Sequence, residues 1–233
     1  MSRAGAPPLI VIPDPRFAPG ATIEGLAAAA LAGGADAIQL RAKALPDEQV
    51  VAVGRRLAAA CRAAGALFFV NDDAAAALAC GADGVHVGPG DSAPAEARRL
   101  LGERGLLGVS VYTDEDLERA AAARADYVAV GAVYPTATKA IAVVGLEGVR
   151  RLRARTRLPI IAIGGVDSAN AAAAVAAGAD GVAVISAVSG ASDPEAATRE
   201  LRTRVLAALG AGPSCQDAAG GGYCRPIPTR GGA

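Results

Sequence analysis

Residues 36–43, Asp-Ala-Ile-Gln-Leu-Arg-Ala-Lys, place polar and charged side chains within an otherwise apolar part of the chain. Successive side chains of an extended strand point to opposite faces, so Gln39, Arg41 and Lys43 would share one face. The runs on either side are typical of helices that would cover such a strand and direct this face into an interior cavity. Unpaired charge is costly there, and an anionic ligand would offset that cost. The segment therefore predicts an anion pocket; the alternative is a strand end whose Arg and Lys reach water.

Two carboxylates, Asp72 and Asp91, follow neighbouring predicted strands. Carboxylate oxygens suit a hard divalent cation such as Mg²⁺, which usually bridges to substrate phosphates. The alternative is structural, with Asp72 or Asp73 capping a helix and Asp91 holding a turn. Capping is the better explanation of the carboxylates alone. Together with the cations Arg41, Lys43 and Lys139, which follow strands at the same rim, they favour a site for a metal and a diphosphate.

Other polar or glycine positions also follow predicted strands. Ser110 follows the fifth strand, the long loop from residue 132 to Lys139 follows the sixth, Gly164-Gly165 follows the seventh and Ser186 follows the eighth. Glycines let backbone amides approach an anion, and the loops after the last two strands of an eight-stranded barrel often bind phosphate. The glycine pair is also explained by a tight turn, and its position is what favours a phosphate site.

The chain has a single histidine, His86, in the middle of a predicted strand. This count excludes a multi-histidine zinc site. A mid-strand histidine is more often hydrogen-bonded within a core than catalytic, so we interpret His86 as structural.

Eight strand-helix pairs must position these residues. A tripeptide Gly-Ala-Asp or Arg-Ala-Asp precedes every second strand, ending at Asp36, Asp83, Asp126 and Asp180. A repeat of two strand-helix pairs favours a closed barrel over an open doubly wound sheet. The sequence predicts a single-domain (βα)8 TIM barrel over residues 1–209 and a disordered Gly/Pro-rich tail over 210–233. The expected strands and helices are 9–12 and 22–31, 37–40 and 47–63, 67–70 and 73–78, 84–87 and 94–101, 106–109 and 114–122, 127–130 and 146–155, 160–163 and 168–176, and 181–185 and 194–209.

Composition narrows the range of partners. The chain balances 23 basic against 23 acidic residues over 233 positions, so its net charge gives no indication of a nucleic acid or membrane surface. Its four cysteines lack the close pairing of metal sites or of small secreted domains, and neither a signal peptide nor a membrane span is predicted. We expect a cytoplasmic protein that acts on small phosphorylated molecules; the sequence leaves its oligomeric state open, a homo-oligomer included.

Six motifs in order resemble the thiamine phosphate synthase family: Gln-Leu-Arg-Ala-Lys at 39–43, Val-Asn-Asp-Asp at 70–73, Gly-Ala-Asp-Gly-Val-His-Val-Gly at 81–88, Gly-Val-Ser at 108–110, Tyr-Pro-Thr-Ala-Thr-Lys at 134–139 and Ala-Ile-Gly-Gly-Val at 162–166. The resemblance runs from about residue 9 to 206. It implies a (βα)8 transferase that joins hydroxymethylpyrimidine diphosphate to hydroxyethylthiazole phosphate and releases diphosphate.

The resemblance also implies roles for individual residues. Its catalytic residues would be Arg41, Lys43, Ser110 and Lys139. Magnesium would be held by Asp72 and Asp91. The pyrimidine would contact Gln39 and Ser110, and its diphosphate would be held by Arg41, Lys43, Asn71 and Lys139. The thiazole phosphate would be held by Thr136, Thr138, Gly165, Ile185 and Ser186.

The chain departs from the family pattern at four places. Ala42 stands where Glu is usual, Val111-Tyr112 follow Ser110 where a Thr-His pair is common, Pro13 replaces a frequent Thr, and residues 140–144 read Ala-Ile-Ala-Val-Val in place of a polar loop. We expect weaker or differently selective turnover from these changes. Two alternatives remain: a thiazole tautomerase on the same barrel, which usually lacks the diphosphate and metal residues, and a barrel that binds phosphate without catalysis.

Overall fold

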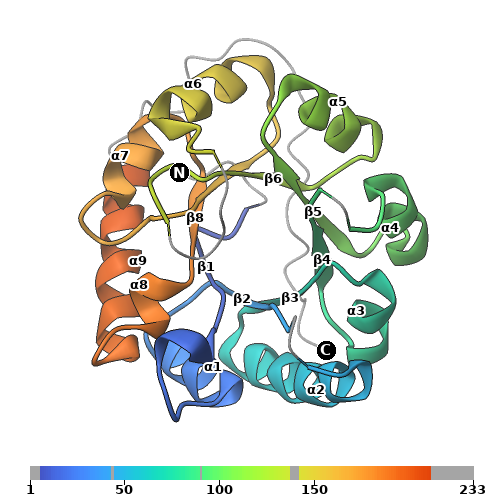
Figure 1. Ribbon diagram of the computed structural model, residues 1–233, viewed down its shortest axis with the longest axis vertical. Helices are drawn as coiled ribbons and strands as arrows, with labels where there is room; N and C mark the ends of the chain where they lie inside the picture. The colour runs from blue at the N-terminus through green and yellow to red at the C-terminus, as the bar shows by residue number, and fades with distance from the viewer. Residues whose placement is uncertain (1–5, 43–44, 90, 137–141, 211–233) are drawn as a thin grey trace.

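The computed structural model describes residues 6–42, 45–89, 91–136 and 142–210. Eight parallel strands form a closed barrel in chain order, with β8 paired to β1. The helices form a ring outside the strands (Figure 1). The strands are β1 (Leu9–Val11), β2 (Ala37–Leu40), β3 (Leu67–Asn71), β4 (Gly84–Val87), β5 (Leu106–Val111), β6 (Tyr127–Val130), β7 (Ile160–Ile163) and β8 (Gly181–Val184). The predicted TIM barrel is confirmed.

The helices alternate with the strands, as the sequence predicts. They are α1 (Ile23–Ala32), α2 (Asp47–Ala64), α3 (Ala74–Cys80), α4 (Pro94–Leu101), α5 (Asp114–Ala122), α6 (Gly145–Arg155), α7 (Ala171–Ala176), α8 (Ser186–Ser189) and α9 (Pro194–Gly210), with a 3₁₀ helix, η1 (Pro15–Phe17). The short α8 and η1 were not predicted. Helix α7 starts three residues late because Asp167 accepts hydrogen bonds from the N–H groups of Ala169 and Asn170, which form a local turn.

Alternation along the strands divides the core in two. Outward-facing residues such as Ile38 and Leu40 pack against the helices in one large apolar cluster. Inward-facing residues such as Ile10, Phe69 and Tyr127 fill the barrel in a second, smaller cluster. Parallel strands buried on both faces require apolar residues on both, which explains the continuous apolar runs in the sequence.

Four aspartates precede the even-numbered strands at the N-terminal end of the barrel. Each accepts a backbone N–H from the preceding strand: Leu9 to Asp36 at 3.1 Å, Phe68 to Asp83 at 2.9 Å, Leu107 to Asp126 at 2.8 Å and Ile160 to Asp180 at 2.9 Å. Ion pairs also join Asp36 to Arg202, Asp126 to Arg98 and Asp180 to Arg153. The repeated tripeptide therefore joins strands in pairs.

Helix α9 ends at Gly210, one residue beyond the predicted boundary of the barrel. The predicted disorder of the tail concerns residues 211–233, which lie outside the described part of the chain.

Candidate active site

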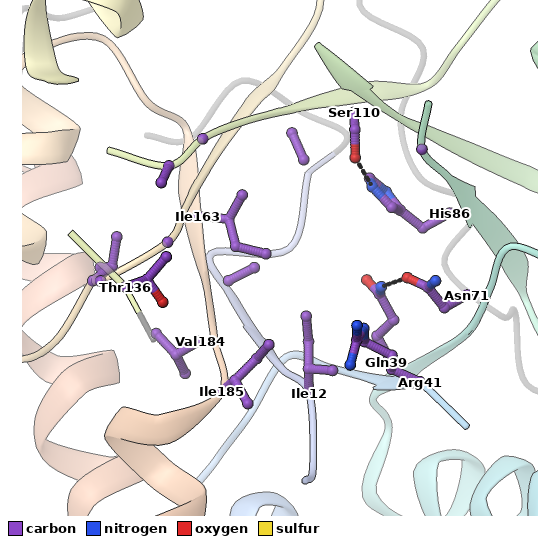
Figure 2. A pocket seen from close by; sticks show the side chains of 18 of the residues that line it. Ile12, Gln39, Arg41, Asn71, His86, Ser110, Thr136, Ile163, Val184 and Ile185 are labelled. Carbon is purple, nitrogen blue, oxygen red and sulfur yellow. Dashed lines mark hydrogen bonds between the residues drawn. The ribbon is translucent and has the colours of Figure 1, made fainter. Parts of the chain in front are cut away.

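A pocket opens at the C-terminal end of the barrel, and one half of it is polar. Gln39 faces inward on β2, Arg41 follows the same strand, and Asn71 ends β3. The Gln39 Nε2 atom donates a hydrogen bond of 2.6 Å to Asn71 Oδ1, which leaves Gln39 Oε1 as an acceptor and Asn71 Nδ2 as a donor. Figure 2 shows these side chains pointing into the same space. Lys43, predicted to share this face, lies outside the described residues.

Asp72 and Asp73 are neighbours whose side chains have different surroundings. Asp73 Oδ1 accepts the N–H of Ala76 at 2.9 Å and caps α3. Asp72 lines the pocket and has a left-handed backbone with φ of 71°, a conformation that Asp and Asn tolerate better than most side chains. Capping thus accounts for Asp73 and leaves Asp72 at the pocket.

Asp91 also lines the pocket, and its Oδ2 atom accepts the N–H of Gly88 at 2.9 Å. The turn role and the pocket position are therefore combined in one residue. Because this bond uses one carboxylate oxygen, the other is available to a ligand.

The donor set fits Mg²⁺ better than a transition metal. Within the described residues, no group of three His, Cys, Asp or Glu side chains could hold a metal ion by itself. Mg²⁺ is commonly bound by one or two carboxylates, with substrate phosphates and water supplying the remaining ligands. Asp72 and Asp91 supply that number of carboxylates beside the cation Arg41.

His86 lies on the pocket wall, where it joins two strands. Its Nε2 atom lies 3.0 Å from Ser110 Oγ on β5, and its Nδ1 atom lies 3.1 Å from the hydroxyl of Tyr127 on β6. Burial lowers the pKa of His86 to about 4, so the ring is neutral near pH 7. The sequence indicated a structural histidine, and the hydrogen bonds agree; its place at the pocket was missed.

Tyr112 lies on the same wall as Ser110. Burial raises the pKa of Tyr112, and a hydrogen bond from Ser110 opposes that rise. A phenol therefore occupies one of the positions at which the chain departs from the family pattern.

The other half of the pocket is apolar and rich in glycine. It contains Ile163, Val184 and Ile185 and the hydroxyl group of Thr136, with Ile12 between the two halves (Figure 2). Ser186 also lines the pocket. At Gly165, where φ is 65°, an added Cβ would lie 2.5 Å from the carbonyl oxygen of Pro135, so a side chain is excluded. Thr138 and Lys139, predicted for this region, lie outside the described residues.

All the predicted site residues that the structure describes thus line one pocket: Gln39, Arg41, Asn71, Asp72, Asp91, Ser110, Thr136, Gly165, Ile185 and Ser186. The family model for thiamine monophosphate synthase matches residues 9–188, which include all of them. The chain belongs to the thiamine monophosphate synthase family. Membership makes the chain a transferase of thiamine biosynthesis.

Relatives of this family resemble the chain over most of its length. The thiamine-phosphate synthase of Moorella thermoacetica is 47% identical over 183 residues, which cover 78% of this chain and 87% of the relative. That of a Roseiflexus species is 46% identical over 202 residues, covering 85% of each chain. The solved thiamine phosphate pyrophosphorylase of Pyrococcus furiosus superposes with a TM-score of 0.79 at 41% identity, covering 86% of this chain and 96% of that one.

No helix in the described part of the chain is both long enough and apolar enough to span a membrane.

Proposed function

We propose that the pocket joins hydroxymethylpyrimidine diphosphate to hydroxyethylthiazole phosphate, forming thiamine phosphate and releasing diphosphate. The observation that carries this proposal is the division of one pocket into two unlike halves. A polar half, with Arg41 and two carboxylates, suits a diphosphate with its cation, and an apolar half with a glycine pair suits a second, phosphorylated ring.

The diphosphate would lie against Arg41 and the Nδ2 donor of Asn71, with Mg²⁺ on Asp72 and Asp91. Guanidinium and amide groups donate hydrogen bonds to phosphate oxygens. Carboxylates bind the Mg²⁺ ion that phosphate oxygens also coordinate. Lys43 and Lys139 are proposed for the same diphosphate on the resemblance of their motifs.

The pyrimidine would contact Gln39 and Ser110. Gln39 Oε1 is left as an acceptor by the bond that its Nε2 donates to Asn71. The Oγ atom of Ser110 is held by His86 Nε2, which lies 3.0 Å away. The two side chains can thus read the edge of a ring that offers polar atoms.

The thiazole phosphate would occupy the other half, with its ring on Ile185 and its phosphate near Thr136, Gly165 and Ser186. Gly164 and Gly165 both have positive φ, and successive backbone N–H groups in such a turn can form an anion-binding concavity. Thr138 is proposed for this phosphate on the resemblance alone.

Bond cleavage would precede bond formation. The carbon–oxygen bond to the diphosphate breaks, its electron pair leaves with the diphosphate, and the pyrimidine carbon becomes cationic. The thiazole nitrogen then donates its lone pair to that carbon. Arg41 stabilises the departing charge, and bound Mg²⁺ supplies further charge neutralisation. This reaction requires no side chain of the pocket to remove a proton. A neutral His86, with its pKa lowered by burial to about 4, agrees with that requirement.

The test mixes purified protein with Mg²⁺ and both substrates and follows thiamine phosphate by fluorescence after oxidation. We expect product that disappears with EDTA and returns with added Mg²⁺. A parallel reaction without the pyrimidine diphosphate should leave the thiazole phosphate unchanged. Isomerisation of the thiazole there would identify a tautomerase, and diphosphate binding without product would identify a non-catalytic barrel; either outcome contradicts the proposal.

We also propose that the protein works in the cytoplasm on small phosphorylated molecules, with no nucleic acid or membrane partner. The balanced charge and the buried free thiols of Cys61 and Cys80 support this setting.

A further inference from the structure

Tyr127 is a buried phenol that the proposed chemistry does not use. It is 2% exposed and lies inside the barrel, where its ring meets Phe69 edge to face at 5.6 Å between centroids. Burial raises the pKa of Tyr127 far above its ordinary value, so the hydroxyl keeps its hydrogen. A buried O–H group needs an acceptor.

The acceptor is His86. Among the described residues, the Nδ1 atom of His86, 3.1 Å away, is the one hydrogen-bond partner of the Tyr127 hydroxyl. The two rings stack with 5.6 Å between centroids and 26° between planes. If Nδ1 carried a hydrogen, the phenol hydrogen would be buried without an acceptor, which is unfavourable.

The backbone of β5 is built around this pair. A Cβ atom added at Gly108 would lie 2.2 Å from Tyr127 Cζ, 2.4 Å from its hydroxyl and 2.5 Å from His86 Nδ1. Gly108 therefore leaves the space in which the phenol and the imidazole meet.

The direction of the hydrogen bonds follows. Because the Tyr127 hydroxyl donates to Nδ1 and the ring is neutral, the single ring hydrogen is on Nε2. Nε2–H then donates to Ser110 Oγ, 3.0 Å away. An oxygen that accepts from His86 directs its own hydrogen away from that ring, to the pocket side, where the Tyr112 hydroxyl is an acceptor with which the substrate would compete.

We propose that Tyr127 is a positioning residue for the pyrimidine site: its hydroxyl holds His86 in the Nε2–H tautomer, which makes Ser110 a hydrogen-bond donor toward the substrate. The role of Ser110 rests on the proposed function. Ser110 would then donate a hydrogen bond to an acceptor on the substrate, such as a ring nitrogen. The Gln39 Oε1 atom would accept a hydrogen bond from a donor on the substrate.

The tautomer can be measured without substrate, because the chain has a single histidine. In the full chain labelled with ¹⁵N-histidine, two-bond ¹H–¹⁵N correlations should show hydrogen on Nε2 and none on Nδ1. Tyr127→Phe should shift the Nδ1 resonance. Tyr134→Phe, which removes a phenol donating to the Asn170 carbonyl at 3.2 Å, should leave both resonances in place. Hydrogen on Nδ1 in the unaltered protein would overturn the proposal.

A double-mutant cycle then shows whether Tyr127 positions Ser110 for the substrate or only stabilises the fold. Tyr127→Phe should lower kcat/KM for the pyrimidine diphosphate about five- to tenfold. It should have no further effect in a Ser110→Ala background, because the two residues act through one chain of hydrogen bonds. Equal losses in both backgrounds would contradict the proposal. If no product forms with any variant while the NMR result holds, the proposed function fails and the tautomer assignment stands.

Discussion

The two ends of the barrel carry aspartates with different partners. At the N-terminal end, Asp36, Asp126 and Asp180 each accept a backbone N–H and pair with an arginine, so their charge is used within the fold. At the C-terminal end, Asp72 and Asp91 face a pocket beside Arg41. The environment of a carboxylate, and not its type, therefore decides whether its charge is used within the fold or faces a pocket.

The largest expected effect belongs to Arg41. Arg41→Ala should lower kcat/KM by on the order of 10³-fold, because the departing diphosphate loses its guanidinium partner. The midpoint of thermal unfolding should stay within about 2 °C, since Arg41 is a half-buried pocket residue and not part of the core. The assay for thiamine phosphate and a thermal melt measure both. A fully active Arg41→Ala protein would contradict the assignment of this pocket to the diphosphate.

A change at the N-terminal end of the barrel should lower stability and leave turnover unchanged. Asp180→Ala removes the acceptor for Ile160 N–H and leaves the guanidinium of Arg153 without its carboxylate. We expect the free energy of unfolding in urea to fall by about 3 kcal/mol, with turnover per folded molecule unchanged.

The matched control for Asp180 is Glu200→Ala, which removes an exposed ion pair with Arg204. It should lower the free energy of unfolding by less than about 1 kcal/mol. Equal effects of the two changes on the free energy of unfolding would mean that the aspartates at the N-terminal end of the barrel do not hold the strands together.

A change with a small expected effect separates position at the C-terminal rim from contact with the pocket. Thr22 caps α1, and its side chain accepts the N–H of Gly25 at 3.0 Å. Thr22→Ala should cost about 1 kcal/mol of stability, measured by urea unfolding, and leave kcat/KM unchanged. A loss of turnover matching that of Arg41→Ala would show that the rim as a whole, and not the residues lining the pocket, is sensitive.

Most of the fold could be predicted from the sequence because each strand and helix has its own pattern. Apolar runs of four or five residues alternate with longer alanine-rich segments, and those patterns placed all eight strands. Helix α8 was missed because four residues, Ser186–Ser189, are too few to show a helical period.

The site could be predicted in part. Alternation on β2 was enough to place Gln39 and Arg41 on the inward face. Which of Asp72 and Asp73 caps α3 could not be read from the sequence, because both follow the same strand and either could cap. The contacts from His86 to Ser110 and Tyr127 depend on the register of three strands, which pairs His86 with Gly108 and Gly108 with Tyr127. A single sequence does not fix that register, although Gly108 marks the close approach.

The most direct test compares the adjacent aspartates. Inorganic diphosphate with Mg²⁺ is titrated calorimetrically into the unaltered protein, Asp72→Asn and Asp73→Asn. Asparagine tolerates the left-handed backbone of Asp72 and is a good helix cap at Asp73, so both variants should fold. We expect Asp73→Asn to bind as the unaltered protein does and Asp72→Asn to bind at least about tenfold more weakly. Equal affinity for all three proteins would contradict the claim that Asp72 serves a ligand.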